Sequence, residues 1–331
     1  MKGCLFAVVL AIAFRSATCQ SPDVPPEDRT KHAVVTVEVE PSVQLEVLDW
    51  GGKGSPVILI PGLGMTAHSF DAFAEKLSST HHVYGITRRG IGKSSAPAPT
   101  ATNYTAARLG ADVVAVMNYL KISKAVLIGH SFGGEELSSV GTSHPEMVSG
   151  LVYLDAAYGY AFYDPRFGNL EIDVRDVREE LANIDPGKLP LDKRDQLREL
   201  LSQLPSLTKG LESLLQRMND HPPPSDPSKL PPPQVVAMSR GQRKFTKMTV
   251  PVLAIFAYQH QLPEDGMLQD EQRRKAAGES TVFTEEHVEA LKTVVPSAHI
   301  VRIPNANHFV FKSNEQEVLQ EVNEFIDGLP R

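Results

Sequence analysis

The stretch AVLIGHSFGG, residues 125–134, decides the fold. Four apolar residues lead into the pattern G-x-S-x-G, which runs from Gly129 to Gly133. A short apolar run of this kind predicts a buried strand, and glycines on both sides of a serine permit a sharp turn into a helix. The sequence therefore predicts a strand–turn–helix unit that holds Ser131 in a strained conformation, with its hydroxyl exposed above a sheet.

Strand-like and helix-like segments alternate on both sides of this unit. Candidate strands lie at 33–39, 43–50, 56–62, 82–87, 124–129, 150–155, 251–257 and 298–304. Several of them are continuous apolar runs, which are typical of strands buried on both faces of a sheet. Segments with helical spacing separate many of these strands. The alternation predicts an α/β fold, with a doubly wound, mostly parallel sheet and helices on both faces.

The alternation stops after about Tyr160. Residues 174–184, 191–204 and 207–218 each carry an apolar helical stripe, and a proline-rich connector at 222–233 follows them. We predict a helical insertion over 161–245, so that the core consists of 31–160 and 246–331. Four aromatic residues close behind Asp155, on both sides of the start of the insertion, are the candidate apolar wall of a pocket: Tyr158, Tyr160, Phe162 and Tyr163.

Several motifs resemble those of the α/β-hydrolase superfamily, in the same order and over nearly the whole chain after the leader. IPGLGMTAHSF, residues 60–70, resembles the loop that supplies an oxyanion amide, with Pro61 in place of the usual His. ITRRGIGKSS, residues 86–95, resembles the Asp-x-Arg-Gly-x-Gly-x-Ser turn, with Thr87 in place of the Asp. The resemblance implies an α/β-hydrolase sheet with the insertion as a helical lid.

The same resemblance implies roles for individual residues. Ser131 stands at the nucleophile position, and His308, just past the last apolar strand, stands at that of the catalytic base. The backbone N–H groups of Leu63 and Phe132 correspond to the oxyanion donors.

The acid that orients the histidine has two candidate locations. The family usually places it after the strand at 251–257, where this chain has His260, with Glu264 and Asp265 a few residues later. A second location is the end of the strand after that of the nucleophile, where the chain has Asp155. We favour Asp155 and keep Glu264 and Asp265 as alternatives, because the latter two stand beyond Pro263 and require a loop that folds back.

The first 20 residues, MKGCLFAVVLAIAFRSATCQ, have the layout of a secretory signal peptide. Lys2 precedes an apolar run that is shorter than the roughly 20 residues of a membrane span, and small residues follow. We predict export to the periplasm or the cell exterior after cleavage near Cys19, with a lipid anchor on Cys19 as an alternative. Both cysteines, Cys4 and Cys19, lie in this leader, so no disulfide is expected in the mature protein.

Composition narrows the choice of function. The chain has 331 residues, 41% of them hydrophobic, and a formal net charge of −7 that gives no reason to expect a nucleic-acid partner. No metal motif is present, and we expect no cofactor. The predicted activity is serine hydrolysis of a small carboxylic ester through an acyl-enzyme. The alternatives are a peptidase, lactonase, thioesterase or acyltransferase on the same residues, or a non-enzymatic binding protein whose acid has decayed.

Overall fold

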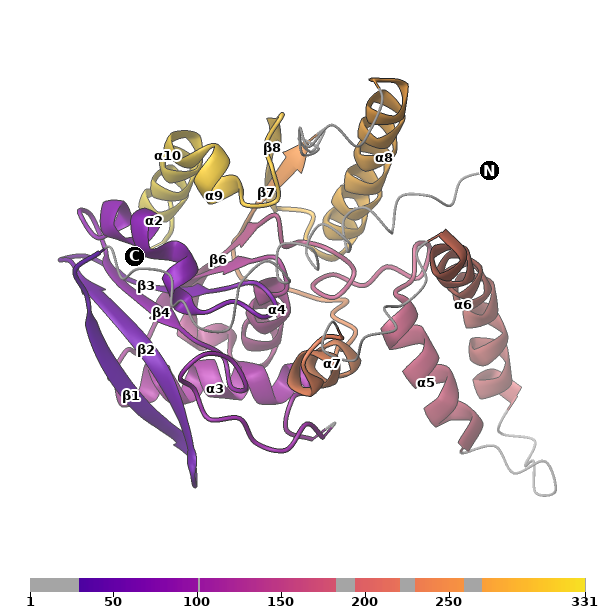
Figure 1. The fold of residues 1–331 in the computed structure, drawn as a ribbon, viewed down its shortest axis with the longest axis horizontal. Coiled ribbons are helices and arrows are strands. Elements are labelled where there is room, and N and C mark those ends of the chain that lie inside the picture. Colours follow the sequence, from indigo (N-terminus) through magenta and orange to yellow (C-terminus); the bar gives the residue numbers. More distant parts are fainter. Residues whose placement is uncertain (1–29, 101, 183–193, 221–229, 259–269, 331) are drawn as a thin grey trace.

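The computed structural model describes residues 30–100, 102–182, 194–220, 230–258 and 270–330. Its centre is an eight-stranded sheet with the order β1-β2-β4-β3-β5-β6-β7-β8 (Figure 1). β1 and β2 are antiparallel to their neighbours, and all the other pairs are parallel. The strands are β1 (Ala33–Glu40), β2 (Val43–Gly51), β3 (Pro56–Ile60), β4 (His82–Ile86), β5 (Ala125–His130), β6 (Val148–Leu154), β7 (Val252–Tyr258) and β8 (His299–Pro304). The predicted doubly wound, mostly parallel sheet is confirmed.

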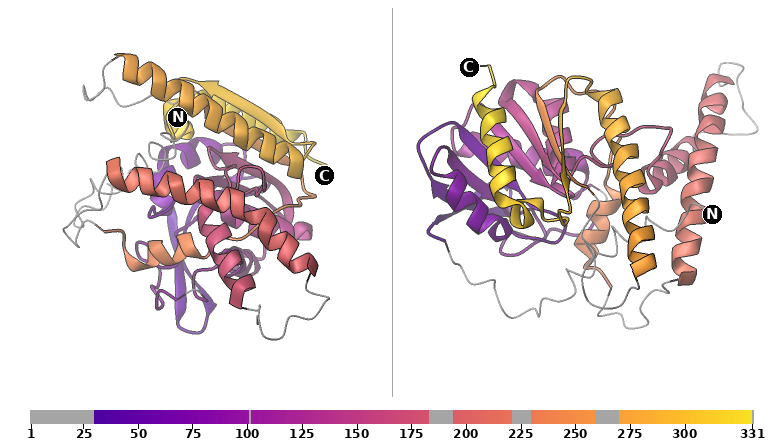
Figure 2. Two further views of the ribbon diagram at one scale, coloured as in Figure 1. Left: turned by 90° about the vertical axis from the view of Figure 1, so that its right-hand side faces the viewer. Right: turned by 90° about the horizontal axis from the view of Figure 1, so that it is seen from above.

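Helices cover both faces of the sheet (Figure 2). One core cluster joins the sheet to α3 (Ala106–Tyr119), α4 (Gly133–Ser143) and α8 (Asp270–Val294). The other joins it to η1 (Ala67–Phe70), α2 (Asp71–Leu77), α9 (Val310–Ser313) and α10 (Glu315–Asp327). Both faces of the parallel strands are therefore apolar, which explains why these strands are continuous apolar runs in the sequence.

Three helices lie in the chain between β6 and β7: α5 (Leu170–Ala182), α6 (Arg194–Asp220) and α7 (Pro233–Arg240). Figures 1 and 2 show α5 and α6 as a pair that projects away from the sheet. The two ends of this insertion lie side by side, because Tyr163 N–H donates to the carbonyl of Phe245 at 3.0 Å. The predicted boundaries at 161 and 245 are close to these two residues and stay predictions as domain limits.

The sequence predicted two helices where the structure has the single helix α6. Pro205 lies inside it. A proline inside a helix removes one backbone hydrogen bond and crowds the preceding turn. Pro205 is exposed, so water can reach the carbonyl group that loses its partner. The loss of this hydrogen bond at Pro205 therefore costs too little free energy to end the helix.

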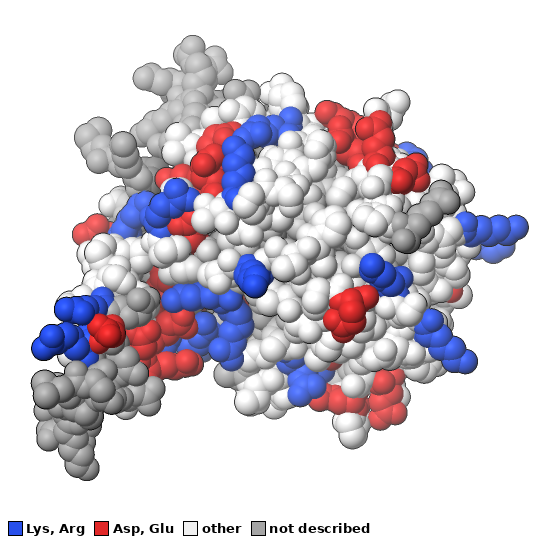
Figure 3. Space-filling view, turned by 180° about the vertical axis from the view of Figure 1, so that it is seen from behind, with Lys and Arg blue, Asp and Glu red and all other residues white. Residues whose placement is uncertain are grey.

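The surface is mixed in charge. Figure 3 shows basic and acidic side chains interspersed over the described part of one face. No helix in the described ranges combines the length and apolarity that crossing a membrane requires.

Candidate active site

Ser131 lies directly after β5 and before α4, at the position that the sequence predicts. Its φ is 50°, in the left-handed region that non-glycine residues rarely adopt. The turn is tight: a Cβ on Gly129 would stand 2.8 Å from the carbonyl carbon of Gly133, and one on Gly133 would stand 2.5 Å from the carbonyl oxygen of Ile60. The neighbouring glycines are thus required by space, and they leave Ser131 half-buried at the edge of the sheet.

His308 lies in the connection between β8 and α9, and its side chain is 8% exposed. Its Nε2 is 2.9 Å from Ser131 Oγ, the spacing of a hydrogen bond. The backbone around it is fixed, because its carbonyl oxygen is 2.9 Å from Nε2 of His130 and Asn307 Oδ1 accepts from the N–H of Phe309 at 2.8 Å. Burial, and then the nearby His308, hold the pKa of His130 well below its ordinary value. His130 therefore serves as a neutral packing residue.

Asp155 follows β6 as Ser131 follows β5. The strand register pairs His130 with Leu154, so that Ser131 and Asp155 leave the sheet at the same edge. Asp155 also has a positive φ, 47°, and its side chain is fully buried. Its Oδ2 is 2.7 Å from Nδ1 of His308. The structure thus places a carboxylate, an imidazole and a hydroxyl in one continuous chain.

The second oxygen of Asp155 receives two donors. Oδ1 accepts from Tyr158 Oη at 2.6 Å and from the backbone N–H of Ala257 at 2.9 Å. Burial, and then the charge of Asp155, raise the pKa of Tyr158 well above its usual value, so this hydroxyl keeps its proton and donates it. The sequence analysis did not foresee this contact, although Tyr158 stands only three residues after Asp155. The alternative acids, Glu264 and Asp265, and also His260, lie outside the described residues.

The loop after β3 brings Leu63 to the same place. A Cβ on Gly62 would stand 3.3 Å from Cβ of Ser131, so the backbone that leads into Leu63 passes directly beside the serine. Leu63 and Phe132 pack in one apolar cluster that also includes Val235 and Met238 of α7. Within the described residues, neither the N–H of Leu63 nor that of Phe132 has a hydrogen-bond acceptor. Both amides can therefore donate to a ligand.

The four aromatic residues predicted to line a pocket have different environments. Tyr160 stands near the site, because its ring packs on Phe132 at a centroid distance of 5.6 Å. Burial, and then the charge of Asp155, raise the pKa of its hydroxyl well above the usual value, and Ser131 opposes this shift. Tyr158 contacts Asp155. Phe162 is fully buried in the core, and Tyr163 donates to Asp173 at 2.6 Å. The expectation therefore fits Tyr160 best and does not fit Phe162.

A buried acid lies one helical turn beyond the serine. Glu135 is fully buried, and neither of its carboxylate oxygens has a partner at normal hydrogen-bond geometry among the described residues. Burial, and then the adjacent Glu136, raise the pKa of Glu135 well above its ordinary value, although the cations Arg88 and Arg175 lie near enough to oppose the shift. This carboxyl group therefore resists ionisation.

One group of described residues has a metal-ligating composition. The donor atoms of His32, His68 and Asp71 lie within 4.8 Å of one another, and two histidines with a carboxylate are ligands that zinc accepts. His68 Nδ1 is already 3.2 Å from Asp71 Oδ2, as expected for a pair three residues apart at the start of a helix. That pairing accounts for the contact between His68 and Asp71 without a metal.

Comparison with known proteins gives a family and several relatives. A family model described as alpha/beta hydrolase fold matches residues 55–235. The sn-1-specific diacylglycerol lipase ABHD11 of Xenopus tropicalis is 27% identical over 184 residues, which are 55% of this chain and 53% of the lipase. A fluoroacetate dehalogenase from Burkholderia sp. is 29% identical over 116 residues, 34% of this chain and 38% of the dehalogenase. The chain thus spans about half or less of the length of these two curated relatives.

Solved structures match over almost their whole length. The esterase RhEst1 from Rhodococcus sp. ECU1013 has a TM-score of 0.55 and 19% identity, covering 90% of this chain and 99% of that one. E-2-(acetamidomethylene)succinate hydrolase has a TM-score of 0.54 and 18% identity, covering 90% and 100%. At this level of identity the likeness concerns the fold alone. The order of the strands, the sharp turn at Ser131 and the family match lead to one conclusion: the chain is a member of the alpha/beta hydrolase fold family.

Proposed function

We propose that this protein is a serine hydrolase that cleaves a small carboxylic ester through an acyl-enzyme on Ser131. The observation that carries the proposal is the hydrogen-bonded chain from Ser131 Oγ through His308 to Asp155, with distances of 2.9 and 2.7 Å. A serine hydroxyl needs a neighbouring base to become a nucleophile, and the base needs a partner that fixes its tautomer.

In the proposed reaction, Ser131 Oγ attacks the ester carbonyl while Nε2 of His308 accepts its proton. His308 then gives this proton to the departing alcohol, and water releases the acyl group by the reverse sequence. Asp155 holds the Nδ1–H of His308 and stabilises the imidazolium that forms. The amides of Leu63 and Phe132 are the proposed donors to the oxyanion, which forms beside Gly62.

Two observations favour an ester over other substrates. Relatives include a lipase, and structures of the same fold include an esterase. Other relatives are named as a dehalogenase and an epoxide hydrolase, but the resemblance implies an aspartate nucleophile for those chemistries, whereas this chain has Ser131 at the turn. We also propose, from the leader-like sequence of residues 1–20, that the reaction takes place after export.

Labelling with a fluorophosphonate, followed by chromogenic esters of increasing acyl length, tests the proposal. The wild type should label rapidly and hydrolyse at least one ester. Ser131→Ala and His308→Ala should each lose several orders of magnitude in kcat while they keep the wild-type circular dichroism spectrum. A folded wild type that neither labels nor turns over esters would instead favour the non-enzymatic binding protein.

A further inference from the structure

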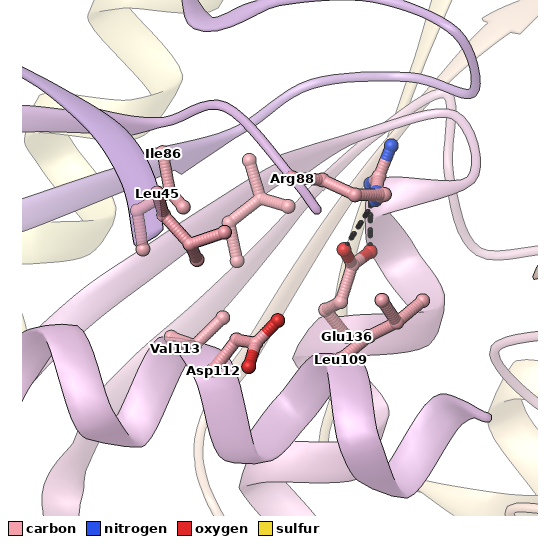
Figure 4. Close-up of a pocket in the computed structure, with 8 residues that line it drawn as sticks. Leu45, Ile86, Arg88, Leu109, Asp112, Val113 and Glu136 are labelled. Atoms are coloured by element: carbon pink, nitrogen blue, oxygen red, sulfur yellow. Dashed lines mark hydrogen bonds and ion pairs between the residues drawn. The ribbon is translucent and has the colours of Figure 1, made fainter. Parts of the chain in front are cut away.

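Arg88, two residues after the end of β4, contacts two separate segments of the chain. Its side chain is 2% exposed, and its guanidinium donates to two backbone carbonyl groups: Nη1 to Gly62 at 3.0 Å and Nη2 to Pro61 at 2.8 Å. The same group pairs with Glu136 through Nε at 2.6 Å and Nη2 at 2.8 Å (Figure 4). One side chain thus joins the loop after β3 to helix α4.

The contact with Gly62 fixes the direction of the next amide. In a trans peptide the C=O of one residue and the N–H of the next point in opposite directions, and the described chain has no cis peptide. The carbonyl of Gly62 is held by Arg88 and by the N–H of Met65 at 3.2 Å. The N–H of Leu63 must therefore point away from Arg88. Since Gly62 lies against Ser131, the N–H of Leu63 is one of the amides proposed to donate to the oxyanion.

The contact with Glu136 concerns the second amide. Glu136 is in the first turn of α4, and Phe132 is the N-cap residue of that helix. The guanidinium carbon of Arg88 also lies 5.6 Å from the ring centroid of Phe132, within cation–π range. Arg88 therefore contacts both chain segments that carry the proposed oxyanion donors.

We propose that Arg88 is a positioning residue that sets the orientation of the Leu63 amide relative to the Phe132 amide. The inference rests on the proposed serine hydrolase function and adds a residue that touches no reacting atom. A planar fork with five donors can hold two carbonyl groups and a carboxylate at once, whereas a lysine ammonium cannot reproduce that geometry. Without the fork, the Pro61–Leu63 segment can rotate, and a preorganised oxyanion donor loses its direction.

The decisive variant is the double substitution Arg88→Met/Glu136→Leu. It removes the donors to both carbonyl groups, yet leaves no unpaired buried charge, since both partners of the ion pair are replaced. Arg88 and Glu136 line a small pocket together with Asp112 and apolar side chains that include Leu45, Ile86 and Val113, so the new apolar side chains have apolar neighbours. Arg88→Lys is the second variant, because it keeps the charge and loses only the fork.

The chain offers a matched control one residue away. Arg89 is fully buried and pairs with Asp112 through two bonds of 2.6 Å, but it touches neither Pro61 nor Gly62. Arg89→Met/Asp112→Leu therefore removes a neighbouring buried pair without touching the loop. Glu40, which also accepts from Arg89, keeps Arg108 as a partner at 3.1 Å. Any loss that comes merely from disturbing the core should appear in this control too.

Measurements are kcat per fluorophosphonate-titrated site, KM, and inhibition by a trifluoromethyl ketone, which forms a tetrahedral oxyanion. Both Arg88 variants should lose about 10- to 100-fold in kcat, with a parallel weakening of the ketone and an almost unchanged KM. The Arg89 control should keep the wild-type kcat per site. Equal kcat and ketone affinity in the Arg88 variants and wild type would overturn the inference. Failure of the wild type itself to label would overturn the proposed function instead.

Discussion

Both carboxylate oxygens of Asp155 accept hydrogen bonds, so the effect of replacing this carboxylate with an amide can be predicted. In Asp155→Asn, the single oxygen of the side chain is required by the donors Tyr158 and Ala257, so the NH₂ group must face His308. An NH₂ donor favours the tautomer in which Nδ1 lacks a proton and Nε2 carries one. His308 can then no longer accept the proton of Ser131. We expect kcat to fall by about 10²- to 10⁴-fold at neutral pH.

The controls for this prediction are Glu264→Gln and Asp265→Asn, the two alternative acids. Each should keep kcat close to that of the wild type. If one of these variants were inactive and Asp155→Asn were fully active, the orienting carboxylate would have to be reassigned to the 259–269 segment.

Glu135 predicts a pH dependence of stability. Its raised pKa means that the native state retains a proton that the unfolded chain releases above a pH of about 4.5. Stability should therefore decrease as pH rises, because the native state binds more protons than the unfolded state. Glu135→Gln removes this proton linkage.

Thermal unfolding of the wild type and Glu135→Gln at pH 4.5 and pH 8 tests the point. The variant should gain stability relative to the wild type at pH 8, and much less at pH 4.5. Glu146→Gln is the control, since Glu146 is exposed and should make little difference at either pH. A variant difference that does not change with pH would show that the pKa of Glu135 is not raised in the native state.

At the residue scale, the sequence predicts the residues that stand at strand ends, and with the family resemblance their pairing with His308, but it misses other contacts between distant segments. Ser131 and Asp155 stand directly after apolar runs, and the register of β5 and β6 brings them to one edge. The contacts of Arg88 with Pro61 and of Asp155 with Ala257 join residues far apart in the chain. These depend on side-chain directions after the sheet has formed, which no local pattern encodes.

At the scale of elements, we predict that the insertion determines which substrates bind, whereas the sheet carries the residues proposed for the chemical step. We propose that it acts as a lid over the site. Tyr160, directly before the insertion, packs on Phe132, whereas Leu215 of α6 is 61% exposed. Tyr160→Ala should change the ratio of kcat/KM between short and long acyl esters by about 1–3 kcal/mol, the range of hydrophobic pocket discrimination. Leu215→Ala should leave this ratio unchanged, and an unchanged ratio in Tyr160→Ala would count against the lid role.

The helices show why element prediction succeeds unevenly. The six strands with parallel neighbours, β3 to β8, were identified from apolar runs, and the antiparallel β1 and β2 were also identified. Helix α8 has a largely polar sequence over residues 270–281, which hides its helical period, and the sequence analysis did not identify it. The two apolar stripes at 191–204 and 207–218 predicted separate helices, but α6 continues through Pro205, whose exposed position makes the missing hydrogen bond tolerable. The exposure of Pro205 depends on how α5 and α6 pack, and this packing cannot be predicted from the local sequence.

At the scale of the whole molecule, the leader remains a prediction, because residues 1–29 lie outside the described ranges. We propose that the protein is exported and that residues up to about Cys19 are removed. The mass of the protein purified from its natural source should then correspond to a chain without this segment, and therefore without cysteine. A mass that includes Met1, or a lipid on Cys19, would contradict cleavage to a soluble product.

The hydrogen bond between Tyr163 and Phe245 has a consequence for how such a molecule can diversify. The insertion departs and returns at neighbouring points, so it is one continuous unit of the chain, and its helix α7 also packs against Leu63 and Phe132. Recombination at the two neighbouring ends can replace the insertion and leave Ser131, Asp155 and His308 in segments encoded outside it. Exchange of the whole insertion, rather than gradual change of one pocket, is then an available route to new specificities around the same proposed site.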